Sequence, residues 1–137
     1  MNNNSLERTL SIIKPDAVER GLETKIKKIL LDSKLNIVES KKIQISREEA
    51  EDFYRVHQTK PFYEKLCSYL SSGPIIVMIL DGENAIQKNR DLMGTTNPKI
   101  AKDGTIRKLY GISIDKNSVH GSDSPENAKA EIDFFFN

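Results

Sequence analysis

The run Ile75–Leu80 restricts the possible folds of this chain more than any other feature. Its sequence, IIVMIL, is apolar at every position and shows no alternation between apolar and polar residues. A short apolar run that follows a glycine and a proline, here Gly73 and Pro74, is typical of a strand at the centre of a sheet. We therefore predict a layered domain in which both faces of this strand are covered.

Strand and helix patterns alternate before this run. Residues 9–14, TLSIIK, predict a strand that ends at Pro15, because proline suits the first turn of a helix. A helix is expected next, broken near Gly21 and resumed through KIKKILLD (25–32). Residues 36–45, NIVESKKIQI, predict a second strand.

Two helices are predicted between the second strand and the apolar run. Ser46 and Glu49 have the spacing of a capping box, which indicates a helix that continues to about His57. Pro61 indicates the start of the next helix, PFYEKLCSYL (61–70).

The second half of the chain predicts one helix, a long polar loop, a strand and a final helix. The first helix ends at Gly94, and the loop spans residues 95–108. The stretch GISI (111–114) predicts the fourth strand. Ser124 is expected to cap the final helix, with Pro125 at its first position.

The resulting order, roughly β-α-β-α-α-β-α-β-α, indicates an α/β (α+β) domain. Its two halves are typical of a ferredoxin-like split βαβ fold, with an antiparallel sheet backed by helices on one face. Since the 137 residues contain no linker or repeat, we expect a single domain over residues 1–137, in which residues 1–5 form a frayed start.

The composition argues against several classes of protein. Lys and Arg total 21 against 20 Asp and Glu, and mixed signs along the chain argue against a dedicated nucleic-acid or membrane-surface binder. Cys67 is the only cysteine, so neither an internal disulfide nor a cysteine-based zinc cluster is possible. No apolar run is long enough to span a membrane, and the first residues lack the pattern of a signal peptide. We therefore expect a cytoplasmic location.

The stretch NSVHGSDS (117–124) contains the residue best suited to chemistry, His120. Small neighbours such as Gly121 and Ser122 leave space beside the imidazole and allow a ligand to approach the backbone. A metal site would need further ligands, and His57 is the only other histidine. A Ser-His-Asp hydrolase would need a serine on a sharp turn, and no G-x-S-x-G motif occurs. The role of covalent nucleophile remains for His120.

Glu131 falls on the apolar stripe of the final helix, which also contains Ala128, Ile132 and Phe135. A carboxylate turned toward a core is costly unless it is paired, and an imidazole N–H of His120 would pair it. This contact would also fix the tautomer and leave the other ring nitrogen free to attack. The alternative is that Glu131 lies at the edge of the stripe and reaches water.

Four polar residues are placed where a phosphate group could be bound. Lys14 ends the first strand, Arg90 lies on the helix after the apolar run, Thr96 begins the long loop, and Arg107 lies within it. Taken singly, each has the character of a surface residue. Neither a P-loop nor a G-x-G-x-x-G motif occurs, so a nucleotide would be held mainly by side chains.

Three ring-bearing residues allow less definite interpretations. Phe62 is either a core aromatic or a platform that stacks on a base, and its sequence position favours the core. Tyr54 is similarly ambiguous. His57, near the end of its helix, is interpreted as a C-terminal cap.

The motif Asn-x-x-His-Gly-Ser-Asp-Ser at 117–124 closely resembles the active-site signature of nucleoside diphosphate kinases. Further blocks resemble the family in the same order: TLSIIKPDAVERGL, KPFYEKLCSYLSSGPIIVMILDGENAI, NRDLMGTTNP and DGTIR. Together they cover nearly the whole chain from Thr9 to Phe135. The resemblance implies a ferredoxin-like domain that transfers the γ-phosphoryl group of a nucleoside triphosphate, typically ATP, to a nucleoside diphosphate.

The resemblance also implies catalytic roles for the residues that match the family motifs. His120 would carry the phosphoryl group on one ring nitrogen, and Glu131 would orient the ring through the other. Ser122 would support that pair. Lys14 and Tyr54 would lie against the transferred phosphoryl group.

Nucleotide-binding roles are implied in the same way. Lys14 and Asn117 would bind the ribose hydroxyls, and Arg90, Thr96 and Arg107 would hold the terminal phosphates.

The resemblance implies further partners of the protein. Phe62 and Ile114 would stack on opposite faces of the base. Mg²⁺ would bridge the nucleotide phosphates without a direct protein ligand, and Asp123 would at most contact its waters. The assembly would be a homo-oligomer built from dimers, either a tetramer or a hexamer. The alternative function is a catalytically silent ferredoxin-like module that binds nucleotides or regulates, but every matched catalytic position is filled, which favours the enzyme.

Overall fold

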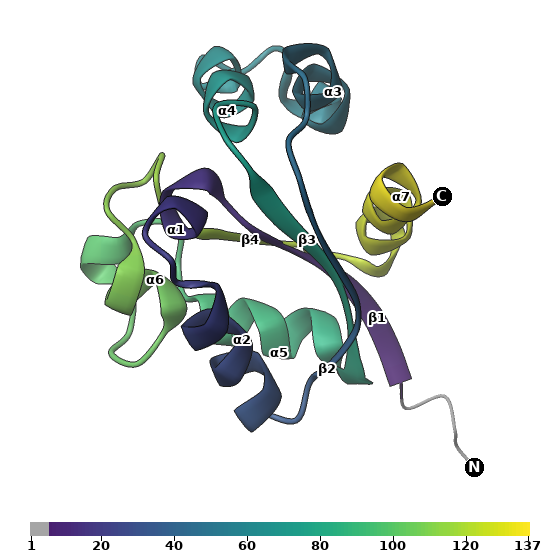
Figure 1. Cartoon of the computed structure of the whole chain (residues 1–137), viewed down its shortest axis with the longest axis vertical. Coiled ribbons are helices and arrows are strands. Elements are labelled where there is room, and N and C mark those ends of the chain that lie inside the picture. The colour runs from purple at the N-terminus through teal and green to yellow at the C-terminus, as the bar shows by residue number, and fades with distance from the viewer. Residues whose placement is uncertain (1–5) are drawn as a thin grey trace.

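Strand β3 (Ile75–Glu83) lies inside the sheet, as the apolar run predicts. The computed structural model describes residues 6–137, and within them four antiparallel strands are hydrogen-bonded in the order β2-β3-β1-β4 (Figure 1). The remaining strands are β1 (Leu6–Ile13), β2 (Asn36–Ile43) and β4 (Val119–Gly121). The frayed start expected for residues 1–5 lies outside the described residues.

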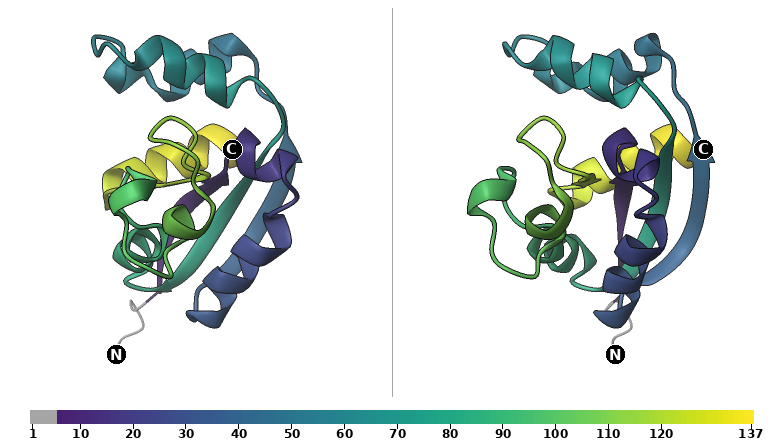
Figure 2. Two further views of the ribbon diagram at one scale, coloured as in Figure 1. Left: turned by 90° about the vertical axis from the view of Figure 1, so that its left-hand side faces the viewer. Right: turned by 60° about the vertical axis from the view of Figure 1, so that its left-hand side comes forward.

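Helices occupy every connection between the strands. They are α1 (Pro15–Glu19), α2 (Glu23–Asp32), α3 (Arg47–Phe53), α4 (Tyr63–Leu70), α5 (Ala85–Met93), α6 (Ile106–Tyr110) and α7 (Pro125–Phe136), with 3₁₀ turns η2 (Arg55–His57) and η3 (Pro98–Ile100). Figure 2 shows α3 and α4 side by side at one end of the molecule. Within residues 6–137, no helix has the length and apolar character needed to cross a membrane.

The side chains of β3 alternate between two hydrophobic clusters, one on each face of the sheet. Ile75 and Val77 pack with residues of α3, α4 and α7, whereas Ile76, Met78 and Leu80 pack with residues of α1, α2, α5 and α6. Figure 1 shows these two groups of helices on opposite sides of the strands. Full burial of one such side chain contributes about 1.5–3 kcal/mol. Coverage of β3 on both faces is therefore confirmed, and the expectation of helices on one face was wrong.

The fourth strand is not where the sequence predicted it. Residues 111–114 form a loop in which Ile112 and Ile114 are more than half exposed, whereas β4 begins at Val119. The β4 pairs are Ser11 with Gly121, Ile12 with His120 and Ile13 with Val119. A strand needs a partner edge as well as β propensity, and β1 offers its free edge to the histidine motif.

Local signals at the ends of helices are confirmed. The Ser46 hydroxyl accepts from the Glu49 backbone N–H at 3.0 Å, and the Glu49 carboxylate accepts from the Ser46 N–H at 2.9 Å. Gly21, with φ 71°, separates α1 from α2, and Gly94 ends α5. Helix α4 begins at Tyr63, two residues after the proline that was expected to start it. The long polar loop contains η3 and the start of α6.

Candidate active site

The pairing of β4 with β1 sets the direction of the His120 side chain. His120 lies opposite Ile12, and residues two positions apart on a strand share one face of the sheet. Val119 packs into the cluster that contains α5. His120 and Ser122 therefore point to the other face, toward α3 and α7.

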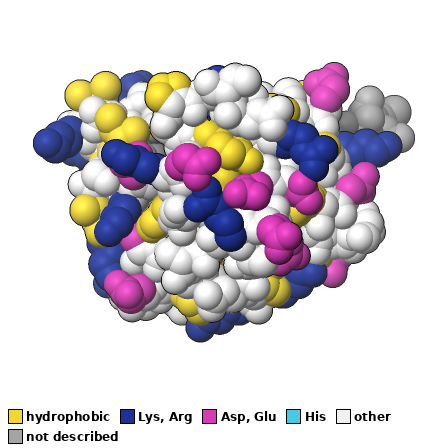
Figure 3. All heavy atoms as spheres, turned by 90° about the horizontal axis from the view of Figure 1, so that it is seen from above, with side chains coloured by type: hydrophobic (Ala, Val, Ile, Leu, Met, Phe, Trp, Pro, Cys, Tyr) yellow, Lys and Arg dark blue, Asp and Glu magenta, His cyan; other side chains and the backbone are white. Residues whose placement is uncertain are grey.

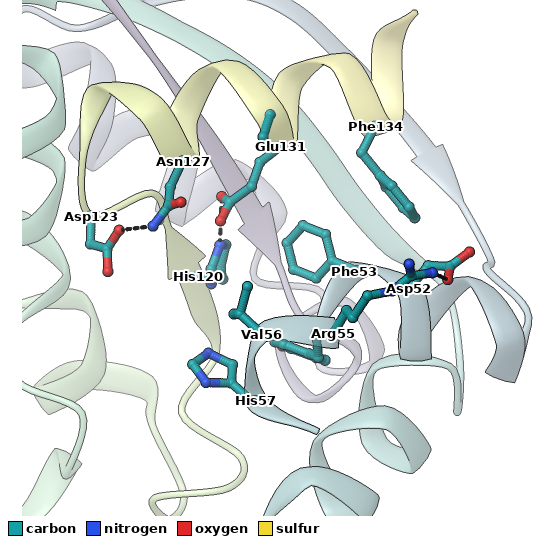
Figure 4. A pocket seen from close by; sticks show the side chains of 13 residues that line it. Asp52, Phe53, Arg55, Val56, His57, His120, Asp123, Asn127, Glu131 and Phe134 are labelled. Carbon is teal, nitrogen blue, oxygen red and sulfur yellow. Dashed lines mark hydrogen bonds and ion pairs between the residues drawn. The ribbon is translucent and has the colours of Figure 1, made fainter. Parts of the chain in front are cut away.

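Glu131 on α7 contacts both of these side chains. His120 Nε2 lies 3.0 Å from Glu131 Oε1, and the Ser122 hydroxyl donates to the same oxygen at 2.7 Å (Figure 4). Because an ionised carboxylate only accepts hydrogen bonds, Nε2 carries the ring proton. In the neutral ring the lone pair then lies on Nδ1, which no described residue hydrogen-bonds.

The local sequence of α7 brings Glu131 within reach of β4. The Ser124 hydroxyl accepts from the Asn127 N–H at 3.1 Å, and Pro125 occupies the first turn, so the helix begins soon after the strand ends. Ala128 and Phe135 are buried and fix the rotation of the helix. Glu131 lies between them at helical spacing, and its side chain is only 20% exposed, so it faces β4 rather than water.

A cavity of about 320 Å³ lies beside the imidazole. Phe53 and His57 line one side, and His120 and Asp123 line the other (Figure 4). The Phe53 ring meets the imidazole edge-on, with 5.4 Å between the ring centroids. The imidazole is therefore held between an aromatic ring and a carboxylate while it faces an open space.

His57 is the cavity residue that sequence reasoning missed. It lies in η2, past the end of α3, rather than on the helix that it was expected to cap. Its Nδ1 is buried and has no hydrogen-bond partner among residues 6–137. Burial, followed by the charge of Lys60, lowers the pKa of His57. Its position three residues after the aromatic pair Phe53-Tyr54 was the only sequence signal that it could face a site.

A second cavity, of about 630 Å³, is lined by Arg90, Thr96 and Arg107. Arg107 donates from Nη1 to the Gly94 carbonyl and from Nη2 to the Val119 carbonyl, both at 2.9 Å. The second bond fixes Arg107 against the strand that presents His120. Arg107 Nε is buried without a partner among the described residues.

Lys14 and Asn117 form a buried pair next to this second cavity. Lys14 Nζ donates to Asn117 Oδ1 at 3.0 Å, and Asn117 Nδ2 donates to the Thr96 carbonyl at 3.2 Å. The pair therefore connects the end of β1 to the start of the polar loop.

The cations around this second cavity disfavour one another's charge. Burial and then the charge of Arg107 lower the pKa of Lys14 to about 8. Burial and then the charge of Arg90 lower the pKa of Arg107 to about 10. An anion among these groups would relieve both effects, because opposite charge favours the protonated forms. The electrostatics thus fit a site for phosphate groups.

Tyr54 is buried at the end of α3 and lines the His120 cavity. Burial, followed by the charge of Glu131, raises its pKa, so the hydroxyl keeps its proton and can donate a hydrogen bond.

Phe62 and Ile114, the residues expected to contact a base, are 42% and 55% exposed. Neither lines the two cavities described above. Phe62 lies 6.0 Å from His57 between ring centroids, which places it just beyond the His120 cavity.

Asp123 lines the His120 cavity as a single carboxylate. Its Oδ1 accepts from Asn127 Nδ2 at 2.6 Å, and this bond is the main cause of its lowered pKa. Among residues 6–137, no group of three or more His, Cys, Asp or Glu side chains is arranged to hold a metal ion.

The sheet presents a histidine paired with a carboxylate, and a second cavity is lined by two arginines, an arrangement that suits proteins that handle phosphate-bearing ligands. The family model described as nucleoside diphosphate kinase matches residues 7–137. The chain belongs to the nucleoside diphosphate kinase family.

Individual relatives show how closely the chain follows this family. A nucleoside diphosphate kinase of Persephonella marina is 53% identical over 132 residues, which is 96% of this chain and 94% of that protein. One from Campylobacter jejuni is 57% identical over 131 residues, or 96% of each chain. The crystal structure of the Aquifex aeolicus nucleoside diphosphate kinase superposes with a TM-score of 0.93 at 40% identity and covers 96% of both chains. The predicted ferredoxin-like fold is therefore confirmed.

Proposed function

We propose that this chain is an enzyme that transfers the γ-phosphoryl group of a nucleoside triphosphate to a nucleoside diphosphate through a phosphohistidine on His120. The geometry that carries the proposal is the 3.0 Å contact between His120 Nε2 and Glu131, which leaves Nδ1 without a partner among the described residues, on a side chain that lines a cavity. Family membership supports the same reaction.

The reaction has two balanced half-reactions. The Nδ1 lone pair attacks the γ-phosphorus, the bond from that phosphorus to the bridging oxygen breaks, and the nucleoside diphosphate leaves with that electron pair. A terminal oxygen of a second nucleoside diphosphate then attacks the phosphohistidine, and His120 is regenerated. During both steps Glu131 stabilises the positive charge that develops on the ring, while Ser122 holds Glu131 in place.

The cations and the buried tyrosine would position the phosphates. Phosphoryl transfer asks a protein mainly for orientation and for positive charge around the equatorial oxygens. Arg90, Thr96 and Arg107 would hold the terminal phosphates, and the Tyr54 hydroxyl, with Lys14, would donate to the transferred group.

Other residues would hold the rest of the nucleotide. Asn117, with Lys14, would bind the ribose hydroxyls. Phe62 and Ile114 would stack on the base, which is a sequence-tolerant contact because every base has a π-face. His57 lines the same cavity as His120 and would lie close to the transferred group.

Mg²⁺ is the divalent cation that we propose for this kinase. When bound to the nucleotide it neutralises charge on the phosphate oxygens. Asp123, one oxygen of which is already held by Asn127, would accept from a water on the ion through its other oxygen.

We also propose a homo-oligomer built from dimers and a cytoplasmic location. Strand β2 is an edge of the sheet, and an eight-residue edge strand is a natural surface for self-association. Sedimentation measurements over a range of concentrations would distinguish a tetramer from a hexamer, and a monomer at all concentrations would contradict the proposal.

Two other functions are less well supported. A silent binding module does not require a histidine paired with a carboxylate and supported by a serine. A dedicated nucleic-acid binder usually gathers its cations into a stripe, whereas Figure 3 shows acidic and basic side chains mixed on the face that it displays.

Intact-mass measurement tests the proposed function. The protein is incubated with Mg-ATP and freed of nucleotide, and we expect an acid-labile phosphate that departs as GTP when GDP is added. His120→Ala should lose both steps while keeping its circular-dichroism spectrum. Undiminished exchange in this variant would exclude His120 as the nucleophile, and an unphosphorylated wild-type protein would favour the silent module.

A further inference from the structure

Ser118 has an unusual backbone conformation two residues before His120. Its φ is 76°, in the left-handed region that non-glycine residues rarely occupy, and it is fully buried. The Val119 N–H donates to the Asn117 carbonyl at 2.9 Å, which closes a three-residue turn around Ser118. A residue in such a conformation is strained and persists only where neighbouring contacts enforce it.

Asp16 supplies the shortest of the side-chain contacts to Ser118, whose hydroxyl also accepts from Arg20 Nη2 at 3.4 Å. The Ser118 hydroxyl donates to Asp16 Oδ2 at 2.9 Å, and the Ser118 carbonyl accepts from the Lys14 N–H at 2.8 Å. Asp16 is itself only 7% exposed. Its Oδ2 also accepts from Arg20 Nη2 at 3.0 Å, and its Oδ1 accepts from the Tyr69 hydroxyl.

The position of Ser118 makes this contact important for His120 in particular. Asn117 has bonds of its own to Lys14 and Thr96, so it stays in place without Ser118. Strand β4, in contrast, has only three residues, and His120 is the middle one. The direction in which β4 leaves the turn therefore decides how the imidazole meets Glu131 and the cavity.

We propose that Asp16 is a positioning residue for phosphoryl transfer, which acts through Ser118 and sets the orientation of His120. The inference rests on the proposed function, since it concerns the rate at which the imidazole is phosphorylated. Asp16 itself touches neither His120 nor Glu131 among the hydrogen bonds described, and its effect passes through the backbone of residues 118–120.

Single-turnover kinetics of Ser118→Ala test the inference. Asp16 keeps Arg20 and Tyr69 as partners in this variant, so the fold is retained. We expect the phosphorylation rate at saturating Mg-ATP to fall about tenfold, because small misplacement of a reacting group has large kinetic effects. The dissociation constant for ADP should change by less than about threefold, since Asn117 and the cations are held independently. Ser118→Gly should recover part of the rate, because glycine adopts the left-handed turn without strain.

Tyr69→Phe is the matched control. It removes a bond to Asp16 Oδ1 and lowers the free energy of unfolding, but it leaves the bond between Ser118 and Oδ2 intact. We expect its phosphorylation rate to stay within about twofold of wild type. An unchanged rate in Ser118→Ala would overturn the inference, as would equal losses in Ser118→Ala and Tyr69→Phe. Failure of the proposed function is distinguishable, because the wild-type protein would then form no phosphohistidine at all.

Discussion

At the scale of single residues, the site is built from charges that are costly to bury. Burial disfavours the charged form of Lys14, and the nearby charge of Arg107 disfavours it further. Burial and then the charge of Arg90 act on Arg107 in the same way. Such charges lower the stability of the ligand-free protein, and an anion bound among them would offset this cost. Side chains that lower stability are expected at positions where ligand binding requires them.

The lowered pKa of Lys14 predicts opposite effects of pH on binding and on stability. Because its folded pKa is about 8, Lys14 loses its proton as pH rises through that value, and the affinity for ADP should fall about tenfold between pH 7 and pH 9. Between about pH 8 and the ordinary lysine pKa of 10.5, the unfolded chain binds more protons, so this residue makes stability rise with pH. Calorimetry and urea denaturation at several pH values measure the two trends. Lys14→Met should flatten both, and trends that persist in this variant would contradict the assignment.

Replacement of Glu131 by Gln should slow phosphorylation without abolishing it. The amide oxygen still accepts from His120 Nε2, but the negative charge that stabilises the developing imidazolium is lost. We expect a rate about tenfold to a hundredfold lower in quenched-flow measurements. Glu126→Gln, an exposed change in the first turn of the same helix, should leave the rate unaltered. A wild-type rate in Glu131→Gln would show that this carboxylate does not assist His120.

At the scale of elements, the site depends on where helices begin and end. Gly94 ends α5 with φ 84°, and its carbonyl accepts from Arg107 on α6. A Cβ at this position would lie 2.6 Å from Thr105 Oγ1, the cap of α6. One glycine therefore allows two helices to approach closely enough for Arg107 to reach the strand of His120.

Gly94→Ala should destabilise the protein and weaken nucleotide binding together. Strain at positive φ and the contact with Thr105 should lower the free energy of unfolding by about 2 kcal/mol or more. Gly104→Ala is the matched control, because Gly104 has φ 85° but no atom near the added Cβ, so it should lose only about 1 kcal/mol and keep its affinity. Urea denaturation measures the loss of stability in each variant, and ADP titration measures the loss of affinity. Equal losses in the two variants would show that the approach of α5 to α6 is not important.

Local sequence signals predicted most of the helices and strands, but they did not predict which segment pairs with the free edge of β1. The capping box at Ser46 and the cap at Ser124 are encoded by adjacent residues and were correct. GISI has the composition of a strand, but the free edge of β1 binds Val119–Gly121 instead. The role of His57 depends on α3 ending before it, which the sequence did not show.

At the scale of the whole molecule, the cations converge from distant parts of the chain. Lys14 follows β1, Arg90 lies on α5 and Arg107 on α6. Their positions in the sequence and the family resemblance both indicated these residues, but their mutual electrostatic effect depends on a fold that unites them. The apolar run predicted that both faces of β3 are covered, but the order of elements did not show that helices form both layers.

Anions should therefore stabilise the entire fold. Inorganic phosphate or ADP would relieve the repulsion among cations contributed by three separate elements, and binding to the folded state alone raises stability by mass action. We expect the melting temperature to rise by several degrees at saturating ADP, in line with about 3–4 kcal/mol from ligand at a thousand times its dissociation constant. Sodium chloride at matched ionic strength is the control. An equal rise with chloride would indicate general screening rather than a specific site.

The contact between β1 and β4 has a consequence for how the protein is made. Leu10 and Ser122 are 112 positions apart, yet they are hydrogen-bonded within the same site. During translation β1 leaves the ribosome long before the histidine strand and the glutamate helix exist. A nascent chain should therefore be inert toward nucleotides until the residues of α7 have been synthesised, and then gain its chemistry in one late folding step.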